Sequence, residues 1–220
     1  MNILHSDKRW NEVIKHAKDN FIRVEVNLDL NLVAFLDTIF QDDQKYRMQL
    51  KETERIYGLK SEQLKFLWKI ILETDSINLI KIKKFIDNFG WLGPNIIGIQ
   101  GNGTLWLVIQ HSDIKTQEKY LPMLREAVKK GNASPSNLAY LEDRVTLRQG
   151  QRQIYGTQIG QDQETGEYYV QPLLDPDNVD KRREEIGFGK LQDYVSGWGI
   201  NWNVEEYKKK LPEIEAKQKK

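Results

Sequence analysis

Residues 105–113 read Leu-Trp-Leu-Val-Ile-Gln-His-Ser-Asp, a continuous apolar run followed by four polar residues. Because no turn-forming residue interrupts the apolar part, the pattern favours a buried helix that becomes polar at Gln110. A buried helix needs other apolar surfaces around it, so the flanking sequence should supply further helices. We therefore expect a helical core with a polar cluster at one end of this central helix.

The segments before this stretch have helical periodicity. Apolar residues three or four positions apart, with acidic residues between them, predict one long amphipathic helix over 28–56. Ser61 is placed to cap a second helix, and Asp75 or Ser76 is expected to start a third that stops at Gly90. Nearer the N-terminus, residues 10–26 predict a helix followed by an extended segment.

Helical patterns also follow the central stretch, until a change at Gly150. Pro122 suits the first turn of a helix that ends at Gly131, and Ser134-Pro135 opens another that runs to Gly150. Two short segments rich in aromatic and branched residues then flank a turn at 162–166, which predicts a β-hairpin.

The remaining C-terminal sequence is strongly charged. A short helix is expected over 179–186, and the mixed Lys/Glu segment from Glu205 predicts a frayed or solvated helix. The expected fold class is therefore mainly α (α+β), a helical domain with one small β-hairpin near residues 152–171. We expect residues 1–29 to form an N-terminal helix and extended segment, 30–195 the helical domain with its hairpin, and 196–220 a C-terminal tail.

Composition excludes several classes of protein. The chain has 220 residues, with 33 Lys and Arg against 32 Asp and Glu, so its net charge of +1 gives no reason to expect nucleic acid as a partner. No apolar run approaches the roughly 18 residues of a membrane span, which predicts a soluble protein. Without cysteine, thiolate catalysis and zinc–cysteine sites are excluded, and we expect no cofactor and no metal. Localisation stays open between cytoplasmic and exported with a leader removed.

Several separated motifs occur in a recognisable order. They are Asp43-Gln44 with Arg47, Gly90-Trp91-Leu92-Gly93, Gly98, Trp106-Leu107, 110–113, 139–144, 153–158, 180–183 and Gly187. This order resembles the bacterial domain-of-unknown-function 6624 family, from about Leu36 to Tyr194. The resemblance implies a shared, mainly helical fold, but no reaction, cofactor or substrate. Leu92 stands where that family usually has proline.

The first candidate site is Gln110-His111-Ser112-Asp113. A histidine at the polar end of a buried helix can have its proton affinity tuned by partial burial and by a carboxylate, so His111 is a candidate general acid or base. The alternative is a structural role, in which the ring of His111 ties down the helix end and Asp113 caps the next helix.

The second candidate is Arg144. Its planar guanidinium could hold a carboxylate or phosphate, or it could pair with an internal carboxylate such as Asp43 or Asp180. Asp143 points about 100° away on the same helix, so each of these two residues needs a partner elsewhere.

The third candidate is the segment 151–158. As a strand it would place Gln153, Tyr155 and Thr157 on one face, with Gly156 leaving room for a ligand or another backbone beside Gln158. The alternative is an edge strand whose amides satisfy neighbouring helix ends.

Other sites are weaker. The glycines at 98, 101 and 103 lack the Lys-Ser or Lys-Thr of a phosphate loop, and the serines lack a nucleophile-elbow pattern. A metal site from His111, Asp113 and Asp143 matches no compact spacing signature.

These candidates lead to one hypothesis and one alternative. The hypothesis is a polar cleft that binds a small ligand, with an anion admissible, and acid–base chemistry at His111. The expected catalytic residues are His111, Asp113 and Arg144, and the expected ligand-binding residues are Gln110, Gln153, Tyr155, Thr157 and Gln158. The alternative is a non-catalytic protein-interaction domain with a structural polar scaffold and a contact surface of exposed aromatics, namely Trp198, Trp202, Tyr168 and Tyr169.

Overall fold

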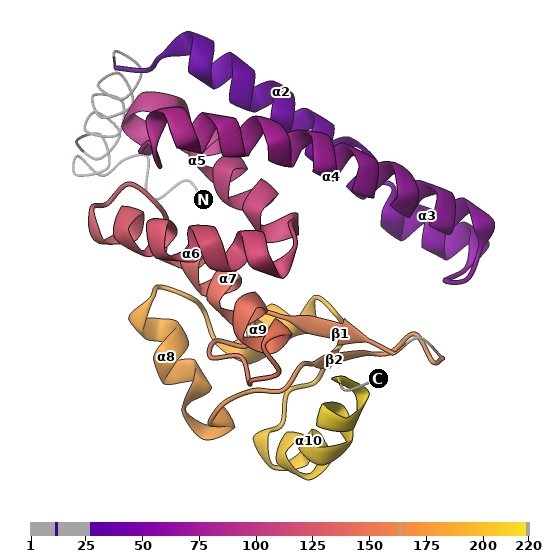
Figure 1. The fold of residues 1–220 in the computed structure, drawn as a ribbon. Coiled ribbons are helices and arrows are strands. Elements are labelled where there is room, and N and C mark those ends of the chain that lie inside the picture. The colour runs from indigo at the N-terminus through magenta and orange to yellow at the C-terminus, as the bar shows by residue number, and fades with distance from the viewer. Residues whose placement is uncertain (1–11, 13–26, 163, 219–220) are drawn as a thin grey trace.

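The computed structural model describes residue 12 and residues 27–162 and 164–218. This part of the chain is mainly helical, with one two-stranded antiparallel sheet, which confirms the expected fold class. Figure 1 shows a helical part built from α2 to α7 and a second part built from the sheet and the C-terminal helices. The helix and extended segment expected over 10–26 lie outside the described residues, apart from residue 12, which is helical.

The first helices differ from the expected ones at two points. Instead of one helix over 28–56 there are two, α2 (Leu30–Arg47) and α3 (Leu50–Tyr57), because a tight turn at Gln49 interrupts the helical hydrogen bonding. Conversely, α4 (Glu62–Phe89) runs unbroken through Asp75 and Ser76. The hydroxyl of Ser76 donates to the carbonyl of Leu72 at 2.9 Å, so it bonds within α4 and caps no new helix.

The central helix, α5 (Pro94–His111), contains the stretch that ends in Gln110 and His111. It bends at Gly98, which has φ of 71°, a left-handed conformation that favours glycine. The next helix, α6 (Ile114–Lys129), starts earlier than expected, because the carboxylate of Asp113 caps it by accepting from the N–H of Thr116 at 2.9 Å. Pro122 therefore lies inside α6.

The seventh helix, α7 (Pro135–Arg148), has the Ser134 cap and the first-turn proline that the sequence predicts. Together α2, α4, α5, α6 and α7 enclose the larger hydrophobic core. Its most buried side chains come from every one of these helices, and they include Leu36, Ile39, Ile82, Ile97, Leu105, Ile109, Leu124 and Leu141.

The sheet consists of β1 (Ile159–Gln161) and β2 (Tyr168–Val170), paired antiparallel with Gly160 opposite Tyr169. The expected hairpin is therefore present, but a strand over 154–159 is wrong for most of its length. The backbone turns at Gly156, which has φ of 72°, and only Gln153 forms an isolated bridge, to Leu173.

A second hydrophobic core lies under the sheet. It is closed by η2 (Pro176–Asn178), α8 (Val179–Glu185), α9 (Leu191–Ser196) and α10 (Val204–Gln218). The expectation of a solvated helix after Glu205 is wrong, because α10 buries Tyr207, Leu211 and Ile214 in this core. These three residues are spaced four and three apart, the period of a helix face. The domain boundaries at 29 and 195 remain predictions.

No helix in the described residues is long and apolar enough to cross a membrane.

Candidate functional site

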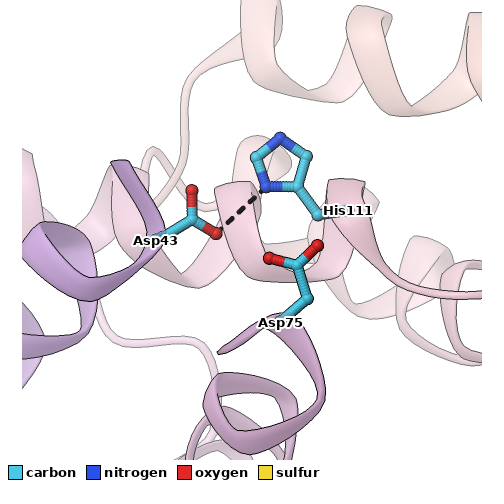
Figure 2. Close-up of side chains that lie close together, drawn as sticks. All are labelled: Asp43, Asp75 and His111. Carbon is cyan, nitrogen blue, oxygen red and sulfur yellow. Dashed lines mark hydrogen bonds and ion pairs between the residues drawn. The ribbon is translucent and has the colours of Figure 1, made fainter. Parts of the chain in front are cut away.

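Three acidic and basic side chains meet where α2, α4 and α5 come together. Figure 2 shows Asp43, Asp75 and His111 converging from these helices, with the imidazole facing the carboxylate of Asp43. The Nδ1 atom of His111 lies 3.0 Å from Oδ1 of Asp43. Since a carboxylate can only accept, Nδ1 carries the proton of a neutral ring, and Nε2 is left with the lone pair.

The two ring nitrogens have different surroundings. Nδ1 bonds to a carboxylate that is almost fully buried, because only 1% of Asp43 is exposed. Nε2 lies on the opposite side of the ring from Asp43 and has no hydrogen-bond partner among the described residues. The side chain of His111 is 18% exposed, so part of it is open to solvent. A fixed ring with one free nitrogen can accept or donate a proton.

Arg47 forms ion pairs with both carboxylates. Its guanidinium makes a two-pronged contact with Asp75, at 2.8 and 2.7 Å, and also lies 3.6 Å from Oδ2 of Asp43. Gln44 adds a hydrogen bond of 2.7 Å to that same oxygen. Both oxygens of Asp43 are therefore engaged, which holds the carboxylate in position against His111.

These partners determine the ionisation of Asp43. Burial by itself raises the pKa of this carboxyl, but the hydrogen bond from His111, the charge of Arg47 and the hydrogen bond from Gln44 hold the pKa below its ordinary value. Asp43 is therefore an anion at neutral pH.

The same residues are the group in the described chain that could hold a metal ion. The ligand atoms of Asp43, Asp75 and His111 all lie within 4.8 Å of one another. Arg47 contacts both carboxylates from within the cluster, so its one positive charge offsets one of their two negative charges. The arrangement is that of an acid–base pair with an arginine beside it.

Arg144 lies beside this cluster. The side-chain oxygen of Gln110, in the orientation that satisfies both groups, accepts from Nε of Arg144 at 2.7 Å and from Nη2 at 3.3 Å. No carboxylate of the described residues forms an ion pair with this guanidinium, so neither Asp43 nor Asp180 is the internal partner considered above. Arg144 is thus a partly buried cation that, among the described residues, has an uncharged amide as its hydrogen-bond partner.

The surroundings of Arg144 oppose its charge. Burial, together with the charges of Arg148 and Arg47, lowers the pKa of Arg144 from 12.5 to about 10. Arg148 in turn donates to the backbone carbonyl of Ser112 at 2.8 Å, next to His111 in the chain. Three guanidinium groups therefore gather around the end of α5, and among the described residues Arg47 forms ion pairs whereas Arg144 and Arg148 do not.

Asp143 has a different role from its neighbour. Its carboxylate is fully buried and accepts from the backbone N–H groups of Ile154, Tyr155 and Thr157 at 2.6 to 3.2 Å. The hydroxyl of Thr157 adds a bond of 2.9 Å. Burial raises the pKa of Asp143, although these hydrogen bonds act in the opposite direction. Asp143 thus fixes the loop before β1 onto α7.

The amides of the same loop are internal. Gln153 donates to the carbonyls of Gln158 and Gln171 at 3.0 and 2.9 Å and accepts from the N–H of Gln158 at 2.8 Å. Gln158 reaches the carbonyl of Tyr140 at 3.3 Å. The space expected beside Gly156 is filled by Leu191, which would lie 3.0 Å from an added Cβ. These amides therefore bond within the loop and to α7, and the segment is not the edge strand that the alternative expected.

Asp113 and Tyr155 lie outside the His111 contacts. Asp113 is exposed, and its hydrogen bonds to the first turn of α6 lower its pKa. Tyr155 uses its backbone N–H on Asp143 and its carbonyl on Arg183, while burial raises the pKa of its phenol. Asp113, predicted to be catalytic, and Tyr155, predicted to bind a ligand, make no hydrogen bond to His111 in the described part of the chain.

The structure thus brings together part of the predicted site. Gln110, His111 and Arg144 are neighbours, whereas Gln153, Thr157 and Gln158 hold the loop. Asp75 was expected only to start a helix and was not predicted as part of the site. Asp43 was considered only as a partner of Arg144 and, with Arg47, through the family resemblance, although their spacing of four on an amphipathic helix would have indicated a pair.

Fold and site together define a mainly helical protein with a His–Asp pair next to an unpaired arginine. The chain matches the model of a family of unknown function (DUF6624) over residues 27–201, and it therefore belongs to that family. No curated protein and no solved structure matches the chain.

Proposed function

We propose that the protein binds a small anion at Arg144 and uses His111, oriented by Asp43, as the acid or base that acts on it. The observation that carries the proposal is the guanidinium of Arg144, partly buried beside Gln110 and without a carboxylate partner in the described residues. A buried charge without a counter-charge is costly in a folded protein, so an arginine kept in this state needs a reason.

An anionic ligand supplies that reason. A carboxylate or phosphate can accept two parallel hydrogen bonds from one guanidinium, and it removes the penalty that now lowers the pKa of Arg144. Arg148 adds positive charge close by. The ligand would then lie next to the residue that precedes His111 in α5.

The acid–base role follows from the arrangement of His111. A carboxylate on Nδ1 and a free Nε2 is the arrangement in which an imidazole takes a proton at Nε2 while the carboxylate stabilises the resulting cation. The proton would move between Nε2 and the bound ligand or a water next to it. Arg47 and Gln44 keep the carboxylate in place during that transfer.

Thermal melting with simple anions tests the binding step. Melting of the full chain, followed by the fluorescence of its six tryptophans, is compared in inorganic phosphate, in acetate and in sodium chloride of equal ionic strength. We expect phosphate or acetate to raise the melting temperature, because a ligand that binds only the folded state stabilises it. Arg144→Gln should abolish the increase.

The matched control is Arg55→Gln. Arg55 is an exposed arginine of α3 paired with Glu52 at 2.6 Å, so this change removes the same charge away from the site. It should leave the increase intact. An equal increase in the Arg144→Gln protein would refute the site, and no increase with either anion in the unaltered protein would refute anion binding.

The protein-interaction alternative has its own support. Tyr168 and Trp198 are both exposed, and their rings contact each other at 5.1 Å between centroids, whereas Trp202 packs against Tyr207. On this alternative His111 only ties α5 to α2. His111→Ala would then lower the melting temperature sharply in every buffer, while the site proposal expects retained folding and a lost anion response.

A further inference from the structure

The long helix α4 has a second apolar stripe besides the one it buries. Leu64, Leu67 and Ile71 face the body of the protein, whereas Phe66, Trp68 and Leu72 are 65%, 45% and 61% exposed. Trp68 and Leu72 are four residues apart, so they lie one turn above the other on the same face. Large apolar side chains grouped in this way mark an interaction surface.

A groove of about 500 Å³ follows this face. It is lined by Trp68, Lys69 and Leu72 in the middle, by Lys65 toward the N-terminal end, and by Glu73 and Ser76 toward the other end. Lys65 therefore lies before the apolar pair, Lys69 between its two members, and Glu73 after it. Lys65 and Glu73 have only weak local pairings, an exposed contact of 2.7 Å from Lys65 to Glu62 and one of 4.0 Å from Lys69 to Glu73.

We propose that this groove is covered by α4 of a second copy of the chain, in an antiparallel arrangement about a twofold axis. Antiparallel pairing brings Lys65 of each copy to Glu73 of the other, which forms two equivalent ion pairs. A parallel pairing would instead oppose Lys65 to Lys65 and Glu73 to Glu73. Lys69 faces Lys69 of the second copy in either arrangement, so the two Lys65–Glu73 pairs are what favour a second copy in the antiparallel direction.

The apolar residues fit the same crossing. If Trp68 packs against Leu72 of the second copy, the twofold axis crosses α4 at residue 70. If Lys65 pairs with Glu73 of the second copy, the axis crosses α4 at residue 69. The two axis positions differ by one residue, which offsets Lys65 from Glu73 of the second copy by two residues, a rise of roughly 3 Å that a lysine side chain spans. One arrangement therefore serves the apolar contact and both ion pairs.

Sedimentation equilibrium of the full chain tests the pairing, through the dissociation constant of the dimer. We expect a concentration-dependent dimer whose dissociation constant rises about tenfold with Lys65→Glu and likewise with Glu73→Lys, a factor typical of losing close charge pairs. The double variant carries both reversals in each copy, so its ion pairs are restored and its dissociation constant should return toward the original value. Leu72→Asp should leave a monomer.

All four changes lie on exposed positions, so the melting temperature of the monomer should hardly move, and circular dichroism checks this. A chain that stays monomeric at every concentration would overturn the proposal, and so would a double variant that associates no better than the single ones. Capture of a different protein by a monomeric chain counts against it in the same way.

Discussion

Nδ1 of His111 lies 3.0 Å from Oδ1 of Asp43, although 68 residues separate the two in the sequence. The contact joins the end of α5 to α2 and leaves Nε2 facing away from the carboxylate (Figure 2). Arg47 holds the other oxygen of Asp43 at 3.6 Å and ties the pair to Asp75. The unpaired Arg144 lies next to Gln110, one residue before this histidine.

Replacing Asp43 by Asn should lower the free energy of unfolding at neutral pH by about 1–3 kcal/mol, because Arg47 and His111 lose a buried anionic partner. Denaturant unfolding measures the change. The matched control is Asp42→Asn, since Asp42 is 45% exposed and contacts Lys81 only at 3.5 Å. We expect that control to change stability by less than about 0.5 kcal/mol. Equal losses in both variants would show that Asp43 has no special partner.

Two buried arginines should respond differently to Met, which keeps most of the apolar stem. Arg183 is 4% exposed and donates to the carbonyls of Gly189 and Tyr155 at 2.7 and 2.8 Å, so Arg183→Met should destabilise by about 2 kcal/mol or more. Arg144→Met removes a charge that burial and its neighbours disfavour. It should leave the free energy of unfolding unchanged or raise it. A loss as large as that of Arg183→Met would mean that the folded protein already satisfies Arg144.

Asp143 should be among the least replaceable polar residues. Asp143→Ala leaves the N–H groups of Ile154, Tyr155 and Thr157 without their acceptor, so we expect a loss of about 3 kcal/mol or more. Hydrogen exchange of these three amides should accelerate in Asp143→Ala, while amides of α4 keep their protection. Unchanged exchange at 154–157 would contradict the assigned role.

The pH dependence of stability should carry the signature of Asp43. Because its pKa is lower in the folded chain than its ordinary 3.8, its contribution is complete above that value and is lost as pH falls through the lower folded-state pKa. The raised pKa of Asp143 has the opposite effect, because the contribution of this group to stability decreases as the pH rises. The stability difference between the unaltered protein and Asp43→Asn should therefore shrink only below about pH 3.8. A difference that shrinks on the alkaline side instead would assign the effect to another group.

Local patterns were enough to predict most of the fold. The run that ends in Gln110, the Ser134-Pro135 helix start and the turn before Tyr168 each rest on neighbouring residues, and the structure contains all three features. The continuous α4 was not predicted, because Asp75 and Ser76 look like helix starters. Arg47 engages that aspartate and the backbone of α4 engages that serine, so neither caps a helix.

The site was harder to predict because its partners are distant in sequence. Nothing local to His111 indicates that Asp43 orients it, and nothing local to Arg144 indicates that it lacks a carboxylate. The segment 153–158 was misread for a physical reason. Its alternating polar residues suggest a strand, but the buried carboxylate of Asp143 gathers its N–H groups into a loop.

The most direct test is whether an anion that binds at Arg144 also changes the environment of His111. Nitrogen-15 NMR of the imidazole rings, with the resonance of His111 assigned through His111→Gln, follows its Nε2 during a titration with inorganic phosphate. We expect the resonance to move with saturation in the unaltered protein and to stay fixed in Arg144→Gln. An Nε2 resonance that ignores phosphate in the unaltered protein, or that moves equally in Arg144→Gln, would contradict a shared anion site.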